Sequence, residues 1–130
     1  MATITSPITI TDVGRNMLRD TLRGASDPKI KYVALGTSNT PPSATDFRLG
    51  NEVFRKAVTS YTPANTGQIV ITLYLAPNDA IGTNIAEIGF FGGSSASVSP
   101  NTGILVARGL YSHLKLDTES IQIVLDFSLL

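Results

Sequence analysis

The 130-residue chain contains no cysteine and no tryptophan, a single histidine, and few charged residues. Without cysteine, disulfides and thiolate metal sites are excluded. Only 15% of the residues are charged, and ten basic residues balance ten acidic ones. No net field therefore draws the chain to nucleic acid or to an anionic membrane. The longest apolar runs, such as IVITLYLA, are far shorter than the ~20 residues that cross a bilayer. We expect no nucleic-acid partner and no membrane insertion.

The first residues, MATITSPITITDVG, lack the charged start and continuous apolar stretch of a signal peptide. We therefore expect the chain to fold in the cytoplasm of the cell that makes it. Residues 1–10 alternate Ile with Thr or Ser around Pro7, which suits an extended arm or an edge strand.

A helix is predicted over residues 11–24. Thr11 is suited to cap its first turn, and Gly24 to end it. Apolar and basic residues then fall on separate faces. The apolar stripe consists of Val13, Met17, Leu18 and Leu22, and the basic stripe of Arg15, Arg19 and Arg23.

From Lys29 onward the apolar residues recur with period two, which is typical of strands. The expected strands lie within 29–36, 53–61, 68–77, 84–93, 103–114 and 119–130. Six strands at hairpin-like spacing predict one mainly β domain over residues 11–130, an antiparallel β-sandwich or a small barrel. Gly109 is the expected bulge, and GGSSASVSPNTG is expected to be a flexible, exposed loop.

Reactive side chains are sparse. His113 lies in LYSHLKLD without a second histidine at metal-ligand spacing, so we interpret it as a structural or surface residue. Glu87 lies between Ala86 and Ile88 and is the acid best placed to be buried. Such a residue could serve as a general acid with a raised pKa. More often it pairs with a base on the next strand, and Arg108 is the candidate.

The most basic stretch is RLGNEVFRKAVTS, residues 48–60. If it is extended, Arg55 and Lys56 point to opposite faces and do not form one phosphate-binding patch. Arg48 and Glu52 are four residues apart and could pair in a helical turn. We predict no catalytic residue, no cofactor and no metal. An enzyme built around Glu87 and His113 remains the competing hypothesis.

The two chain ends suggest an assembly unit instead. An alternating arm ahead of a compact domain could add a strand to a neighbouring subunit. The sequence DFSLL ends on apolar residues that need cover. The predicted assembly interface therefore consists of Ile4, Ile8, Ile10, Leu129 and Leu130. The alternative is a monomeric sandwich that packs both termini on its own core.

Four stretches, spanning residues 9 to 128, carry a resemblance in their order and spacing. They are ITDVGRNMLRDTLRG, KIKYVALGTSNTPPSATDFRLGNEVFRKAV, NIAEIGFFGG and GILVARGLYSHLKLDTESIQIVLDF. Together they resemble small virion proteins of tailed bacteriophages, of the tail-fibre and baseplate-associated kind. The resemblance implies a non-enzymatic structural subunit of the virion, located in the tail, the baseplate or the fibre attachment. It further implies symmetric copies, as a trimer or hexamer, with other tail or baseplate proteins as partners.

Two other readings stay open. A capsid decoration protein would also be small, β-rich and oligomeric. A carbohydrate-binding β-sandwich would attach to host surface glycan through exposed aromatic residues, although tryptophan is absent. The available platforms are Tyr61, Tyr74, Tyr111 and Phe91.

Overall fold

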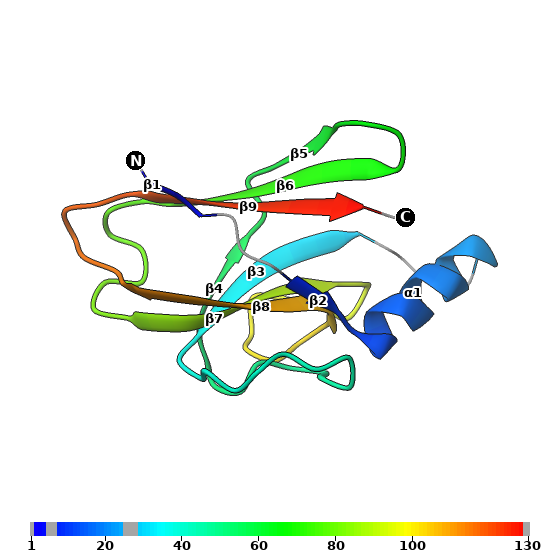
Figure 1. The fold of residues 1–130 in the computed structure, drawn as a ribbon, viewed down its shortest axis with the longest axis horizontal. Coiled ribbons are helices and arrows are strands. Elements are labelled where there is room, and N and C mark those ends of the chain that lie inside the picture. Colours follow the sequence, from blue (N-terminus) through cyan, green and yellow to red (C-terminus); the bar gives the residue numbers. More distant parts are fainter. Residues whose placement is uncertain (1, 5–7, 25–28, 129–130) are drawn as a thin grey trace.

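The computed structural model describes residues 2–4, 8–24 and 29–128. One helix and two β-sheets make up the fold (Figure 1). The elements are β1 Ala2–Ile4, β2 Ile8–Ile10, α1 Asp12–Leu22, β3 Ile30–Gly36, β4 Glu52–Ala57, β5 Ser60–Pro63, β6 Gln68–Leu75, β7 Asn84–Gly92, β8 Ile104–Leu114 and β9 Ile121–Ser128.

The strands form a sandwich rather than a closed barrel. One sheet has the order β1-β9-β6-β5, and the other β2-β8-β7-β3-β4. All pairs are antiparallel except β1 with β9, which is parallel. The predicted mainly β fold with antiparallel sheets and one helix is thus confirmed.

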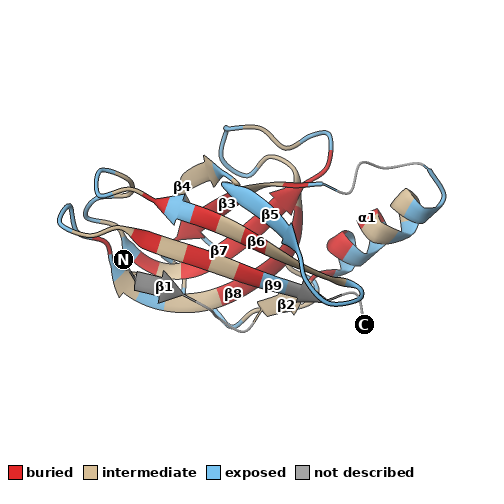
Figure 2. Ribbon diagram, turned by 90° about the horizontal axis from the view of Figure 1, so that it is seen from above, coloured by how far each residue is buried: buried red, intermediate tan, exposed pale blue. Residues whose placement is uncertain are grey.

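Alternate side chains of β6 and β9 fill the space between the two sheets. Buried residues recur at every second position of both strands, as the red bands in Figure 2 show. They are Ile71, Leu73, Leu75, Ile121, Ile123 and Leu125, as the period-two pattern predicted. From the other sheet, Val33, Leu35, Ile88 and Phe90 complete this core.

The outer face of the second sheet is covered by two loops, 37–51 and 93–103. Leu49 from the first loop packs with Ala34, Phe91 and Leu105 in a second small core. Gly89 permits this contact, because a Cβ there would lie 2.6 Å from Leu49 Cδ2. The loops therefore form an irregular third layer on this face of the sandwich.

Helix α1 lies at one end of the sandwich, opposite the β6–β7 and β8–β9 connections (Figure 1). The Thr11 hydroxyl caps it by accepting from the Gly14 N–H, as predicted. Met17 is buried and Leu18 packs against the core, whereas Val13 and Leu22 are exposed. Two of the four residues of the predicted apolar stripe therefore contact the core. In the part of the chain that the structure describes, no helix is long and apolar enough to cross a membrane.

The N-terminal segment corrects one expectation. Where the structure describes residues 1–10, they form edge strands paired within their own chain, so the edge-strand alternative is confirmed and the free arm is not. Strand β1 pairs with β9 at one sheet edge, and β2 pairs with β8 at an edge of the other sheet. The short strands are extended as predicted, but their hydrogen-bond partners are intramolecular.

The predicted bulge at Gly109 is also wrong, since Gly109 pairs in regular register with both Ile8 and Ile88. The register instead shifts where Ile85 pairs with His113 and Glu87 with Leu110. Three steps along β8 there match two along β7, which is the two-against-one count of a bulge. Ile85 and Ile88 of β7 both belong to the core although they are three residues apart, against strict alternation.

Candidate functional site

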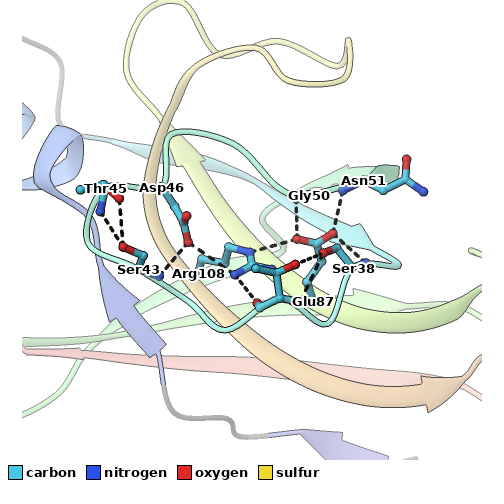
Figure 3. A network of polar contacts seen from close by, with 9 residues as sticks. Ser38, Ser43, Thr45, Asp46, Gly50, Asn51, Glu87 and Arg108 are labelled. Carbon is cyan, nitrogen blue, oxygen red and sulfur yellow. Dashed lines mark hydrogen bonds and ion pairs between the residues drawn. The ribbon is translucent and has the colours of Figure 1, made fainter.

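The most extensive polar cluster surrounds Glu87 on β7. Its Oε1 accepts from the Gly50 N–H at 2.8 Å and from Arg108 Nε at 3.0 Å. Its Oε2 accepts from the N–H groups of Ser38 at 3.0 Å and Asn51 at 2.9 Å. Figure 3 shows the carboxylate held between loop 37–51 and β8. The predicted pairing of Glu87 with Arg108 is confirmed.

Arg108 extends this cluster along the same loop. Its Nη1 donates to the Thr40 carbonyl at 2.9 Å and lies 3.4 Å from Asp46 Oδ2. Asp46 Oδ2 in turn accepts from the Ser43 N–H at 2.8 Å (Figure 3). The side chains of Glu87 and Arg108 are 0% and 3% exposed. We call Glu87, Arg108 and Asp46 the loop anchor.

The loop anchor has little capacity for catalysis. An ionised carboxylate offers about four lone-pair sites, and Glu87 uses four in bonds to the protein. No lone pair of the Glu87 carboxylate is left to accept a proton from a substrate. The arrangement therefore favours the structural interpretation of Glu87: a buried charge that fastens a loop to a sheet.

Arg55 performs the same task for the second loop, which sequence reasoning missed. Its guanidinium pairs with both carboxylate oxygens of Glu52 and lies 4.2 Å from the Phe91 ring centroid. Its Nη1 also donates to the carbonyls of Ser97 and Thr102. The loop expected to be flexible is thus tied to the sheet. No local pattern revealed this, because the carbonyls lie more than 40 residues from the arginine.

Glu52 therefore has another partner than the predicted Arg48. Residues 48–51 form no helical turn, and Arg48 lies over the Phe47 ring at 5.3 Å. Arg55 and Lys56 do point apart, as expected, because Lys56 binds Asp79 at 2.6 Å rather than the loop. Residues 48–60 do not form one basic patch.

His113 lies at the other end of β8. Its Nε2 contacts Glu119 Oε1, and its ring stacks on Tyr111 with centroids 5.9 Å apart. His113 pairs with Ile85 in the ladder, whereas Glu87 pairs with Leu110, three residues before His113 on β8. The side-chain contacts of Glu87 and His113 share no residue, so the structure does not join them in one site. Among the described residues, no group of three or more His, Asp or Glu could hold a metal ion.

An apolar pocket of about 530 Å³ lies between α1 and the β5–β6 hairpin. Met17, Ile30, Ile69 and Val106 contribute apolar walls. Tyr61 stands at its rim, where burial raises the pKa of its hydroxyl. We call it the helix pocket.

A second pocket, of about 560 Å³, opens over the bulge between β7 and β8. Its lining mixes uncharged polar residues with apolar ones, whereas the lining of the helix pocket is mainly apolar. It is lined by Thr37, Asn39, Asn84, Ile85, Ala86, Leu110, Tyr111 and Ser112. We call it the bulge pocket. Of the four aromatic platforms expected from the sequence, Tyr111 alone lies there, whereas Phe91 is buried and Tyr61 lines the helix pocket.

Of the five predicted interface residues, the structure describes the three isoleucines and not the two leucines. Ile8 and Ile10 are half-buried and pack against the core of their own chain. Ile4 pairs with Ile123 in the β1–β9 ladder. Leu129 and Leu130 lie outside the described residues.

Exposed apolar side chains also lie at the two ends of the sandwich, apart from these predicted interface residues. At one end, Ile81, Leu114 and Leu116 are 54%, 50% and 47% exposed. Their segments are joined by bonds from Gly82 N to Lys115 O and from Lys115 N to Thr83 O. We call these three residues the tip patch.

At the helix end, Val13 and Phe47 border a groove that also includes Arg48 and Asn101. Phe47 is 62% exposed. We call it the helix-end groove. The tip patch and the helix-end groove differ in residues and in shape, and they lie on different elements.

Comparisons with protein-family models, with curated proteins and with solved structures found no match to this chain.

Proposed function

We propose that this chain is a non-enzymatic structural subunit of a bacteriophage virion, in the tail, baseplate or fibre attachment, that assembles in symmetric copies. The observation that carries the proposal is a pair of unlike exposed surfaces: the apolar tip patch, and the helix-end groove, which mixes apolar side chains with Arg48 and Asn101. The virion assignment itself derives from the sequence resemblance described above.

Unlike surfaces favour head-to-tail contacts between copies. Such contacts join one surface of a subunit to a different surface of the next, and they close into rings when the rotation allows. Contiguous exposed apolar side chains are a feature of protein–protein contact sites. A subunit that meets two neighbours through opposite ends would cover both surfaces.

The interior supports the same proposal. Three buried cations, Arg55, Arg108 and Lys115, each donate to loop carbonyls. Lys115 binds the carbonyls of Pro77 and Leu116 and so holds the segments that carry the tip patch. These buried charges hold the loops in one arrangement, which suits a structural subunit whose surfaces must keep their shape.

Native mass spectrometry over a range of concentrations tests the assembly. We expect a closed oligomer of several copies, and Leu114→Glu should shift it to monomer. Val98→Glu is the matched control, because Val98 is a 76% exposed aliphatic residue outside both surfaces. A wild-type chain that stays monomeric at every concentration overturns the assembly proposal. Labelled electron micrographs of purified particles test the location, and particles without label contradict it.

A further inference from the structure

The bulge pocket differs from the other hollows in the chemistry of its walls. Its polar lining consists of hydroxyl and amide side chains, and no charged side chain contributes to it. Its volume of about 560 Å³ lies within the range of small-molecule sites. An ionic ligand entering it would lose water without gaining a counter-charge. The walls therefore suit a neutral ligand.

Three of these side chains are available to such a ligand. In the described part of the chain, the side chains of Asn39, Asn84 and Ser112 make no hydrogen bond to the protein. Each amide offers two donors and one acceptor, and the hydroxyl offers both functions. A ligand rich in hydroxyl groups could satisfy both functions at once.

Tyr111 adds an apolar platform beside these groups. Its ring is stacked on His113, which is itself held by Glu119. Tyr111 and Ser112 are the two residues of β8 that the register shift sets against Ala86 alone. Bulges of this kind re-aim side chains and are frequent beside binding sites.

The loop anchor makes the pocket wall rigid. Asn39 lies between Ser38, whose N–H is bound by Glu87, and Thr40, whose carbonyl is bound by Arg108. The backbone is thus fixed on both sides of the amide that faces the pocket. Pre-organisation of this kind lowers the entropic cost of binding.

From these observations we infer that the bulge pocket binds a neutral saccharide. Sugar hydroxyls pair with Asn39, Asn84 and Ser112, and an apolar face of the sugar ring lies on Tyr111. The inference goes beyond the proposed structural function and does not depend on it, since a monomer would carry the same pocket.

The test is a titration of the full ¹⁵N-labelled chain with neutral hexose and N-acetylhexosamine mono- and disaccharides, followed by NMR. We expect saturable shifts of the side-chain amide signals of Asn39 and Asn84 with at least one of these sugars. Asn84→Ala should raise the Kd about three- to tenfold, as loss of one hydrogen bond implies. Tyr111→Ala should raise it by about tenfold or more, because the ring contact is lost.

Two matched variants complete the design. Tyr74→Ala and Asn78→Ala remove the same residue types outside the pocket and should leave the Kd unchanged. Because Tyr111 also packs against the core, the dispersion of the spectrum verifies that its variant is folded, and Asn84→Ala gives an independent reading. The inference is overturned if no neutral sugar shifts these amides, if the control variants lose binding equally, or if only uronic acids bind.

Discussion

Glu87 and Arg108 lie on neighbouring strands and join through Arg108 Nε and Glu87 Oε1 at 3.0 Å, with both side chains buried. The pair is offset by two register positions, since Glu87 pairs with Leu110 and Arg108 with Gly89. Each partner also binds loop 37–51, so the ion pair fastens the loop layer to the sheet. Removing Arg108 would leave Glu87 buried without its counter-ion, and removing Glu87 would leave Arg108 with the longer contact to Asp46 at 3.4 Å.

Glu87→Gln should therefore lower the free energy of unfolding by about 3–5 kcal/mol. The amide nitrogen would also face N–H donors where a carboxylate oxygen now accepts. Urea denaturation with a constant m-value measures the loss. Glu119→Gln is the control, because its carboxylate is 29% exposed and pairs near the surface, and it should cost less than about 1 kcal/mol. Equal losses in the two variants would contradict the role of the loop anchor.

Gly14→Ala should destabilise the fold, although alanine is the better helix former by about 1 kcal/mol. A Cβ at Gly14 would lie 2.7 Å from the Val106 carbonyl oxygen and 2.9 Å from its Cα. Both atoms belong to backbone of β8 and cannot move aside cheaply. We expect a net loss of about 1–3 kcal/mol, as overpacking typically costs.

Asn16→Ala is the matched change on the exposed face of the same helix. This variant should leave the melting temperature unchanged or raise it slightly, because alanine has a higher helix propensity than asparagine. If Gly14→Ala also raised the melting temperature, the close approach of α1 to β8 would be wrong.

Arg55→Lys should loosen loop 93–103 while keeping the charge. Lysine cannot pair with both Glu52 oxygens and reach the carbonyls of Ser97 and Thr102 in one geometry. We expect a loss of about 2–3 kcal/mol. Hydrogen exchange should quicken in residues 94–103 more than in β6. Arg48→Lys, at an exposed arginine, should change neither quantity.

Local sequence patterns predicted a mainly β fold, as a sandwich or a small barrel, and the buried face of β6 and β9. The capping preference of Thr11 predicted the helix start, because each of these features depends on residues close in sequence. The bulge at Tyr111 and Ser112 and the β1–β9 pairing were missed, since both depend on the register between separate strands. The Glu87–Arg108 pair could be foreseen from adjacent strands. The Arg55 bonds could not, because their acceptors are backbone carbonyls that carry no residue signature.

Lys56 and Asp79 should give the fold a measurable acid sensitivity. Burial alone would raise the pKa of Asp79, but the hydrogen bond from Lys56 and the Ala76 N–H hold that pKa below its ordinary value. A lowered native pKa stabilises the fold above the unfolded pKa of about 3.9, and this stabilisation is lost as the pH falls through the native pKa.

Asp79→Asn should accordingly cost about 0.5–1 kcal/mol at pH 7, the upper range for partly exposed pairs. The difference from wild type should shrink steadily below about pH 4. Urea denaturation of both proteins between pH 7 and pH 2.5 gives the curve. A difference that stayed constant with pH would show that the carboxylate charge has no part in it.

Deletion of residues 1–10 should destabilise the single chain, and not merely detach an arm. Strand β2 forms a ladder with β8, and Ile8 and Ile10 pack against the core between the sheets. Loss of two half-buried isoleucines implies about 2–3 kcal/mol from burial.

The same deletion would also expose the β9 edge at Ile121–Ile123 and the β8 edge at Ala107–Gly109. Unpaired edges recruit other strands, so the truncated chain should associate non-specifically as it weakens. Denaturation and light scattering of the truncated and full chains, at equal concentration, measure both effects. A truncated chain of unchanged stability would mean that these strands find their partners on a neighbouring copy.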